Sequence, residues 1–221
     1  MKDVDAERLL VIVGSGGHGR VVCDIARAIG RTKLLFCDPA RAADKKLDDV
    51  PISSLDEVAL LEEFGGRAEF IVAIGSRTVR RNALSRLEEA GASIACLLHP
   101  RASVSERTVI APGTVAMAGA IINVGATIGA GTIINTGAIV DHDCVIGRWC
   151  HVAPGAVLGG TVTVGDLTDI GAGAVVLLNR KVGAGATVGA GAVVNRDVAD
   201  GVTVVGSPAR PMSVLEKRTV T

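Results

Sequence analysis

A six-residue period runs through the second half of the chain. From Val104 to Val194 an aliphatic residue returns at every sixth position, weakened only at Ala116. A second series of small residues follows four positions after each aliphatic one; it includes Thr108, Thr114, Ala120, Ala126, Thr132, Ala138, Cys144, Cys150 and Ala156. Six is not a multiple of the helical turn, and so many glycines and β-branched residues disfavour a helix. The period instead indicates a short strand and a tight turn in every unit.

Three such units close one triangular coil, with aliphatic residues stacked inward and glycine at the corners. Sixteen units in one register predict about five coils. At a strand spacing of roughly 4.8 Å, the resulting prism is about 25 Å long. Composition supports this prediction, because 28 glycines stand against three Phe, one Trp and no Tyr. A core with so few aromatic rings must pack small and β-branched residues in a regular way.

Charge and cysteine content exclude several classes of function. Lys and Arg together number 23, as do Asp and Glu. This balance leaves no basic footprint for nucleic acid. No apolar run reaches about 18 residues, so no membrane insertion is expected. The acidic N-terminus has no long apolar stretch, so no secretion signal is expected. The five cysteines show no metal-site spacing, which favours reduced thiols, a cytoplasmic location and no bound metal.

The first half has a different pattern. Residues 8–13 form an expected strand, followed by the glycine-rich loop 14–19 and an amphipathic helix that ends near Gly30. Further strands are expected at 33–37, 69–74 and 93–98, with a charged helix at about 78–90. This alternation predicts a small Rossmann-like α/β domain with a parallel sheet over residues 1–100. The repeat domain then occupies residues 101–221.

The glycine-rich loop matches the dinucleotide fingerprint at Gly14, Gly16 and Gly19, and Asp38 lies where a ribose-binding acid is expected. A sheet of about 90 residues is too short for the two halves that a dinucleotide needs, so no NAD site is predicted. Bare backbone N–H groups at a helix N-terminus can bind a phosphate. A tight strand-to-helix turn without any ligand is the alternative.

The repeat resembles that of the hexapeptide-repeat acyltransferases over residues 104 to about 212, including a closing segment at 204–212. In that family the prism is a left-handed parallel β-helix, and three chains pack side by side. Acetyl-CoA or an acyl-carrier protein lies in the cleft between neighbours. The resemblance therefore implies a homotrimer that uses acetyl-CoA, although the fold also serves as a scaffold.

The two halves together resemble the PglD/NeuD-type sugar acetyltransferases over nearly the whole chain. Those relatives N-acetylate 4-amino-4,6-dideoxy sugars carried on UDP, GDP or dTDP, and one branch is linked to sialic acid O-acetylation. The resemblance is most specific at residues 14–19 with Asp38, and at residues 134–151. It implies that the α/β domain binds a nucleotide-linked amino sugar. The β-helix is then the acetyl-CoA-binding and catalytic domain, in glycan or O-antigen biosynthesis.

The resemblance also implies the roles of particular residues. In the family the histidine corresponding to His142 is the proposed general base, with Asp143 as its acidic neighbour, and the histidine corresponding to His151 contacts acetyl-CoA. The implied substrate-binding residues are Gly16, Gly17, His18, Asp38, Gly75 and Asn135. Backbone around Gly160, Ala172 and Ala190 is expected to lie along the CoA. Ala153 stands where some relatives have a serine.

The spacing of the histidines is consistent with these roles. His142 and His151 are separated by half of a three-unit coil, so they are predicted on different faces of one subunit. They could share a site only across a subunit boundary. A neutral imidazole, with a pKa of about 6.5, accepts a proton from an amine near neutral pH. Asp143 would orient the ring and favour its charged form. The alternative is that each histidine is a solvated corner residue.

Other functions fit the sequence less well. A γ-type carbonic anhydrase needs three zinc-binding histidines, and this prism contains two. An NAD oxidoreductase leaves the prism unexplained. A sugar O-acetyltransferase, acting on sialic acid or another sugar, remains the main alternative, followed by a non-enzymatic sugar-nucleotide-binding scaffold. Cys144 and Cys150 occupy inward positions and are interpreted as packing residues rather than nucleophiles. The sequence does not choose among UDP, GDP and dTDP.

Overall fold

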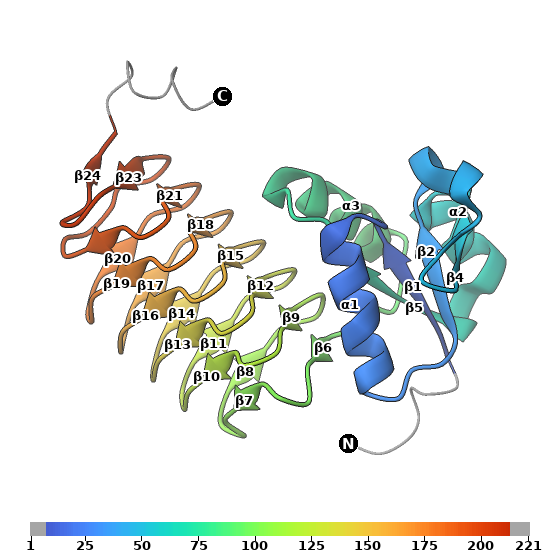
Figure 1. The fold of residues 1–221 in the computed structure, drawn as a ribbon, viewed down its shortest axis with the longest axis horizontal. Coiled ribbons are helices and arrows are strands. Elements are labelled where there is room, and N and C mark those ends of the chain that lie inside the picture. Colours follow the sequence, from blue (N-terminus) through green and yellow to red (C-terminus); the bar gives the residue numbers. More distant parts are fainter. Residues whose placement is uncertain (1–7, 213–221) are drawn as a thin grey trace. The chain divides into compact units, whose positions relative to one another are not determined.

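The computed structural model describes residues 8–212, so the expected domain ends at 1–7 and 213–221 lie outside it. The chain divides into two compact units (Figure 1). The first contains the described residues up to Pro100 together with Pro112–Val115. The second contains Arg101–Ala111 and the described residues from Ala116 onward. Within residues 8–212, none of the helices combines the length and the apolar character needed to cross a membrane.

The first unit is built on a five-stranded sheet in the order β3-β4-β2-β1-β5. Its strands are β1 (Leu9–Val13), β2 (Leu34–Cys37), β3 (Lys46–Leu47), β4 (Val50–Ser53) and β5 (Ala68–Val72). The first, second, fourth and fifth run parallel, whereas β3 pairs antiparallel with β4. The expected parallel α/β fold is confirmed. The β3–β4 pair was not expected, because two such short strands carry no readable alternation.

Three helices and two 3₁₀ segments accompany the sheet: α1 (Gly17–Ala28), η1 (Pro39–Asp44), α2 (Glu57–Phe64), η2 (Gly65–Arg67) and α3 (Arg77–Glu89). One face of α1 is buried through Val22 and Ile25, and the helix is followed by Gly30 in the left-handed region. The sequence reading missed α2. Its eight residues are too few for a clear helical period, although Asp56 caps it by accepting from two backbone N–H groups.

The segment expected as one strand at 93–98 is not a single strand. Ile94 forms an isolated bridge with Phe70 of β5, whereas β6 (Leu97–Leu98) ends the sheet that also contains β9. The backbone changes partner between them: the Ala95 N–H donates to Phe70 and the Leu97 N–H donates to Thr114. The sequence showed the apolar run correctly, but a change of hydrogen-bond partner leaves no trace in hydropathy.

The second unit is a left-handed parallel β-helix, as predicted. The following two-residue strands form its coils: β7 (Ser103–Val104), β8 (Val109–Ile110), β9 (Val115–Ala116), β10 (Ile121–Ile122), β11 (Thr127–Ile128), β12 (Ile133–Ile134), β13 (Ile139–Val140), β14 (Val145–Ile146), β15 (His151–Val152), β16 (Val157–Leu158), β17 (Thr163–Val164), β18 (Asp169–Ile170), β19 (Val175–Val176), β20 (Lys181–Val182), β21 (Thr187–Val188) and β22 (Val193–Val194). They stack into three sheets, visible as the repeated coils of Figure 1. Each strand pairs with its counterpart in the next coil, as Ile121 does with Ile139.

The core of the prism follows the six-residue period. The second residue of each strand points inward, and Ile134, Val140 and Val152 are completely buried. The small series is also inward, since Cys144 and Cys150 are completely buried and donate their S–H groups to carbonyls of the next coil. Each fully buried aliphatic side chain contributes about 1.5–3 kcal/mol. Stacking of like residues from coil to coil therefore supplies most of the core.

The corners of the prism differ in composition. We call the turn residues 124–125, 142–143, 160–161 and 178–179 the first corner, and 136–137, 154–155, 172–173 and 190–191 the second corner. In the second corner, glycine occupies the left-handed position of every coil. In the first corner, Asp143, Thr161 and Asn179 take left-handed backbone conformations instead. Such conformations are costly without glycine, so this corner departs from the simplest repeat.

The prism ends in a small hairpin. Strand β23 (Thr203–Val205) adds in parallel to β21, and β24 (Arg210–Pro211) pairs antiparallel with β23. The Ala209 N–H donates to the carbonyl of Val193, which ties the hairpin to the last coil. This hairpin corresponds to the closing segment expected at 204–212.

Candidate functional site

His142 lies in the first corner, between β13 and β14, and its backbone is fixed from both sides. Its N–H donates to Oδ1 of Asp141 at 2.7 Å, and the same oxygen accepts from Nδ2 of Asn123 at 2.8 Å. These two hydrogen bonds lower the pKa of Asp141. The carbonyl of His142 accepts from the Thr161 N–H at 2.9 Å. The imidazole is thus attached to a rigid turn although it is half exposed.

Asp143 orients the imidazole. Its Oδ2 lies 2.9 Å from Nδ1 of His142, and this hydrogen bond is the main reason that the pKa of His142 is raised above its ordinary value. With Nδ1 donating to the carboxylate, Nε2 is left as the acceptor on the opposite side of the ring. Asp143 has a φ of 58°, a conformation that aspartate tolerates better than most residues. The corner therefore presents an oriented base.

Gly160 lies against this base from the next coil. A Cβ atom at Gly160 would lie 2.4 Å from Nε2 of His142, so no larger residue fits there without moving the ring. The same cleft is lined by Val157, Leu177 and Leu178, and 60% of Leu178 is exposed. A proton-accepting nitrogen therefore lies beside an open apolar wall. Such a cleft suits a ligand that has both an apolar part and a reactive group.

His151 lies on another face of the prism, at the start of β15. Its Nε2 is 2.9 Å from Nδ2 of Asn135. The Oδ1 of that amide already accepts from the Thr136 N–H at 2.7 Å, so Nδ2 must be the donor and Nε2 the acceptor. The structure brings Asn135 to His151 rather than to His142.

Ala172 and Ala190 lie one above the other in the second corner. Both are exposed, and the Gly191 N–H donates to the carbonyl of Ala172. The residues expected along the CoA thus fall on two sites of one prism: Gly160 lies with His142 in the first corner, and the two alanines lie in the second. The prediction that the two histidines occupy different faces of one subunit is confirmed by their strands and turns.

The glycine-rich loop of the first unit joins β1 to α1. Gly14 has a φ of 99°, and a Cβ atom at Gly19 would lie 2.1 Å from the Gly14 carbonyl oxygen. These two glycines are required by the backbone. By contrast, a Cβ atom at Gly16 or Gly17 would meet no atom within 4 Å. No side chain caps α1, and no acidic residue occupies its first turn, so its N-terminus is open to an anion.

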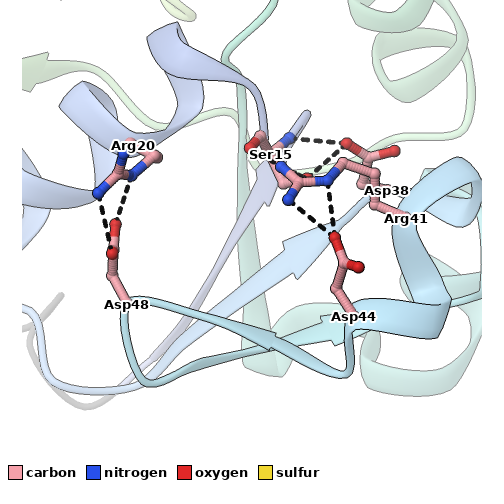
Figure 2. Close-up of polar contacts among 6 residues, drawn as sticks. All are labelled: Ser15, Arg20, Asp38, Arg41, Asp44 and Asp48. Atoms are coloured by element: carbon pink, nitrogen blue, oxygen red, sulfur yellow. Dashed lines mark hydrogen bonds and ion pairs between the residues drawn. The ribbon is translucent and has the colours of Figure 1, made fainter.

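Asp38 fixes the same loop, as Figure 2 shows. Its Oδ2 accepts from the backbone N–H of Ser15 at 2.9 Å and from the Ser15 hydroxyl at 2.6 Å. Arg41 supports the turn from the other side, because Nη1 donates to the Ser15 carbonyl at 2.8 Å while the guanidinium pairs with Asp44. A separate ion pair joins Arg20 of α1 to Asp48. Oδ1 of Asp38 accepts no hydrogen bond from residues 8–212 and remains available to a ligand.

A cleft opens at the carboxyl ends of β1, β2 and β5. Its walls include Gly16, Gly17, His18, Asp38 and Gly75, which are the residues expected to bind the nucleotide. Parallel α/β sheets bind ligands at this edge. The structure thus brings five of the six predicted substrate-binding residues together, and places the sixth, the asparagine described above, in the other unit.

Comparison with known proteins identifies the chain. Residues 9–87 match the PglD N-terminal domain, and residues 125–160 match the bacterial transferase hexapeptide repeats. The acetyltransferase domain of PglB from Neisseria gonorrhoeae, in complex with acetyl coenzyme A, is 36% identical with a TM-score of 0.88. The match covers 93% of this chain and 100% of that one. This chain belongs to the PglD/NeuD-type acetyltransferases of the hexapeptide-repeat superfamily.

Two further relatives of this acetyltransferase are informative. A histidine-to-alanine variant of GDP-perosamine N-acetyltransferase from Caulobacter crescentus, in complex with CoA and GDP-perosamine, is 37% identical with a TM-score of 0.85. That match covers 93% of this chain and 97% of the Caulobacter chain. The UDP-N-acetylbacillosamine N-acetyltransferase of Bacillus subtilis is 38% identical over 113 residues. The latter match spans about half of each chain, 49% of this one and 51% of the Bacillus protein.

Sequence reasoning missed several residues that shape the acetyltransferase's sites. Arg80 is completely buried and donates to the carbonyls of Ile74 and Gly75, at 2.8 and 2.7 Å, which fixes one wall of the cleft in the first unit. Glu57 and Arg86 also line that cleft. A charged residue of a polar helix gives no sign in the sequence of being buried or of lining a cleft. No sequence signal therefore distinguished these three residues from solvent-exposed ones. Within residues 8–212, no cluster of three or more His, Cys, Asp or Glu could hold a metal ion.

Proposed function

We propose that this protein is an acetyl-CoA-dependent N-acetyltransferase for the 4-amino group of a nucleotide-linked 4-amino-4,6-dideoxy sugar. The observation that carries the proposal is the His142–Asp143 pair, whose Nε2 lies against Gly160 beside an apolar cleft. The Caulobacter relative, which binds CoA and GDP-perosamine, and the Bacillus relative, an N-acetyltransferase of a UDP sugar, support this substrate class.

The chemistry needs one base and no covalent intermediate. The neutral amine of the sugar attacks the thioester carbonyl of acetyl-CoA, and a C–N bond forms as the carbonyl oxygen becomes negative. Neutral His142 takes the proton that the amine loses. The C–S bond then breaks, and the departing CoA thiolate receives a proton, giving amide and free thiol. Asp143 stabilises the imidazolium during this transfer, which is the effect that raises the pKa of His142.

We also propose a homotrimer in which each acetyl-CoA contacts two subunits. The support is the separation of the implied residues: His142 and Gly160 lie in the first corner, whereas His151, Ala172 and Ala190 lie on or beside the second. Packing prisms side by side would bring the two groups together. The exposed Leu177 and Leu178 beside His142 form an apolar surface that a neighbouring subunit or the pantetheine would cover.

The first unit is proposed to hold the nucleotide. Its diphosphate would bind the uncapped N-terminus of α1, at Gly16, Gly17 and His18. Oδ1 of Asp38 would accept a hydrogen bond from a ribose hydroxyl, while Oδ2 remains hydrogen-bonded to Ser15.

The test is a thiol-release assay with acetyl-CoA and a panel of UDP-, GDP- and dTDP-linked 4-amino-6-deoxy sugars. We expect one nucleotide sugar to be acetylated, and the rate to fall by about 10²–10⁴-fold in His142→Ala. His99→Ala is the matched control, because no proposed role includes His99, and it should retain activity. The His142 variant should also keep its fold, since half of the His142 side chain is exposed.

Two results would contradict the proposal. A folded protein that binds acetyl-CoA but acetylates no amino sugar would point to a hydroxyl acceptor, such as sialic acid. Failure to bind acetyl-CoA would exclude the acetyltransferase activity itself. Sedimentation measurements on the same sample test the trimer separately, and a stable monomer with full activity would exclude a shared site.

A further inference from the structure

The nucleotide cleft of the first unit has a charged end that the proposed phosphate and ribose contacts leave unused. Glu57, the first residue of α2, and Arg86 of α3 line this end together with Cys37. Val79 and Ala83, also from α3, form an apolar wall beside them. The walls of this cleft thus include both the uncapped N-terminus of α1 and an ion pair.

Glu57 has one oxygen in use and one available. Its side chain is 7% exposed, and Oε1 accepts from both Nε and Nη2 of Arg86, the former at 2.9 Å. Across residues 8–212, no donor is bonded to Oε2. Oε2 is not enclosed by protein atoms and stays accessible from the cleft that Glu57 lines. Since Glu57 lines the cleft, a ligand N–H is the natural partner for that oxygen.

The electrostatic character of this end supports the same partner. Burial, followed by the negative charges of Glu57, Asp56 and Asp38, raises the pKa of the Cys37 thiol to about 12. Arg86 opposes these negative charges, and the oxygen of Glu57 that Arg86 does not bond is an acceptor suited to an N–H donor. The N-terminus of α1, in contrast, favours an anion. A nucleoside diphosphate matches this polarity when its diphosphate lies at α1 and its base lies at Glu57.

We propose that Glu57 recognises a lactam nucleobase: its Oε2 accepts a hydrogen bond from the ring N–H of uracil, thymine or guanine. Arg86 then lies beside the adjacent carbonyl oxygen of the base. This inference rests on the proposed nucleotide-sugar substrate and specifies which bases the cleft accepts. In cytosine and adenine the equivalent ring nitrogen carries a lone pair instead of a hydrogen. That lone pair would face a carboxylate oxygen and leave it without a donor. The apolar Val79 and Ala83 suit the face of the ring.

The test is calorimetric binding of UDP, dTDP, GDP, CDP and ADP without acetyl-CoA. We expect at least one lactam nucleotide to bind about tenfold or more tightly than CDP and ADP, as a hydrogen bond to a charged group predicts. Methylation of the ring nitrogen in the base that binds, as N3-methyl-UDP, N3-methyl-dTDP or N1-methyl-GDP, should abolish this advantage. These ligand probes need no protein variant.

Glu57→Gln provides the complementary change. This substitution should weaken binding of the lactam nucleotide about tenfold and leave binding of the methylated nucleotide unchanged. The effects of the substitution and of the methylation are then not additive. Glu63→Gln, an exposed residue of the same helix, is the matched control and should alter neither. The preferred nucleotide in the wild-type panel distinguishes uracil, thymine and guanine.

The outcomes separate this inference from the proposed function. Equal binding of all five nucleotides, or equal binding of the methylated and unmethylated forms, would overturn the role of Glu57 while leaving the proposed function intact. Tighter binding of CDP or ADP would also overturn it. If the wild-type protein binds no nucleoside diphosphate, the proposed nucleotide-sugar substrate is wrong and the inference falls with it.

Discussion

The β-helix and the α/β unit position their candidate sites in different ways. In the β-helix each strand pairs with its counterpart in the next coil, so one coil predicts the next. His142 therefore meets Gly160 because the two occupy the same place in consecutive coils. In the α/β unit, β1 pairs with strands that begin at Leu34 and Ala68, and no sequence period relates them. Asp38 meets Ser15 only because β1 and β2 pair in parallel.

This difference decides how a functional residue can be recognised in each unit. A repeat has nearly identical coils, so a residue that breaks the pattern without improving the core indicates function. Asp143 takes a left-handed conformation that glycine adopts at lower cost. Trp149, Thr161, Leu167 and Asn179 do so too, and Asp143 differs from them in its hydrogen bond to Nδ1 of His142. In the α/β unit no such baseline exists, and a glycine that serves the backbone looks the same in sequence as one that serves a ligand. The following predictions test this contrast.

The largest effect is expected where the repeat places a glycine against the base. Gly160→Ala puts a methyl group 2.4 Å from the position of Nε2 of His142. Because the imidazole is half exposed, it can rotate away without unfolding the coil. Displacement of a catalytic group by about 1 Å costs on the order of 10²-fold in rate. We expect kcat/KM to fall by about that factor while the melting temperature hardly changes.

Gly183→Ala is the matched comparison within the prism. Its methyl group would meet backbone atoms of Ala199 and Asp200, at 2.7 and 2.5 Å, rather than a movable side chain alone. The expected result is the reverse: a loss of about 1–3 kcal/mol of stability in denaturant unfolding, with activity retained at low temperature. If Gly160→Ala proved destabilising and kept its activity, His142 would not be held as described.

In the α/β unit, two glycines of the same loop should separate folding from binding. Gly19→Ala brings a methyl group against the Gly14 carbonyl and is expected to cost about 1–3 kcal/mol of stability. Gly17→Ala meets no atom, and alanine is favoured within a helix by about 0.5–1 kcal/mol, so stability should be kept or raised. The added methyl group nevertheless narrows the uncapped end of α1.

Binding of the preferred nucleoside diphosphate provides the readout for this pair. We expect Gly17→Ala to weaken it by about tenfold, the equivalent of about 1.4 kcal/mol, in spite of the unchanged or higher melting temperature. Unchanged affinity would mean that the loop is a turn without a ligand, the alternative that the sequence left open.

The smallest effect concerns the pH dependence of the reaction. The neutral imidazole is the active form, and Asp143 raises the pKa of His142, so kcat/KM should fall as the pH drops through that raised pKa. Asp143→Asn removes the negative charge and should lower the pKa of His142, moving the acid limb to lower pH. Asparagine also tolerates the left-handed backbone, so stability should be retained.

A pH–rate profile of both proteins checks this expectation. On the plateau above the acid limbs of both proteins, the variant should lose less than the roughly 10²–10⁴-fold expected when a general base is lost. An acid limb that stays in place, or moves to higher pH, would show that Asp143 does not set the protonation of His142.

The sequence alone determined the prism, its register, its inward residues and the positions of the two histidines on different faces. The reason is physical. In a stacked repeat, the position of a residue within its six-residue unit determines which residues of the neighbouring coils it contacts, and each short strand and turn depends on the residues of its own unit. It also showed the glycine-rich loop and the parallel sheet, because β1 is an uninterrupted apolar run and α1 is long enough to carry a helical period.

Tertiary structure alone decided the contacts of individual polar groups. It paired Asn135 with His151, attached Asp38 to Ser15, and buried Arg80 beneath the loop at Gly75. It also left one oxygen of Glu57 without a partner among the described residues. Charged side chains have the same hydropathy whether exposed or buried. Their partners lie on elements joined through the sheet rather than along the chain, so only the folded arrangement shows which of them meet.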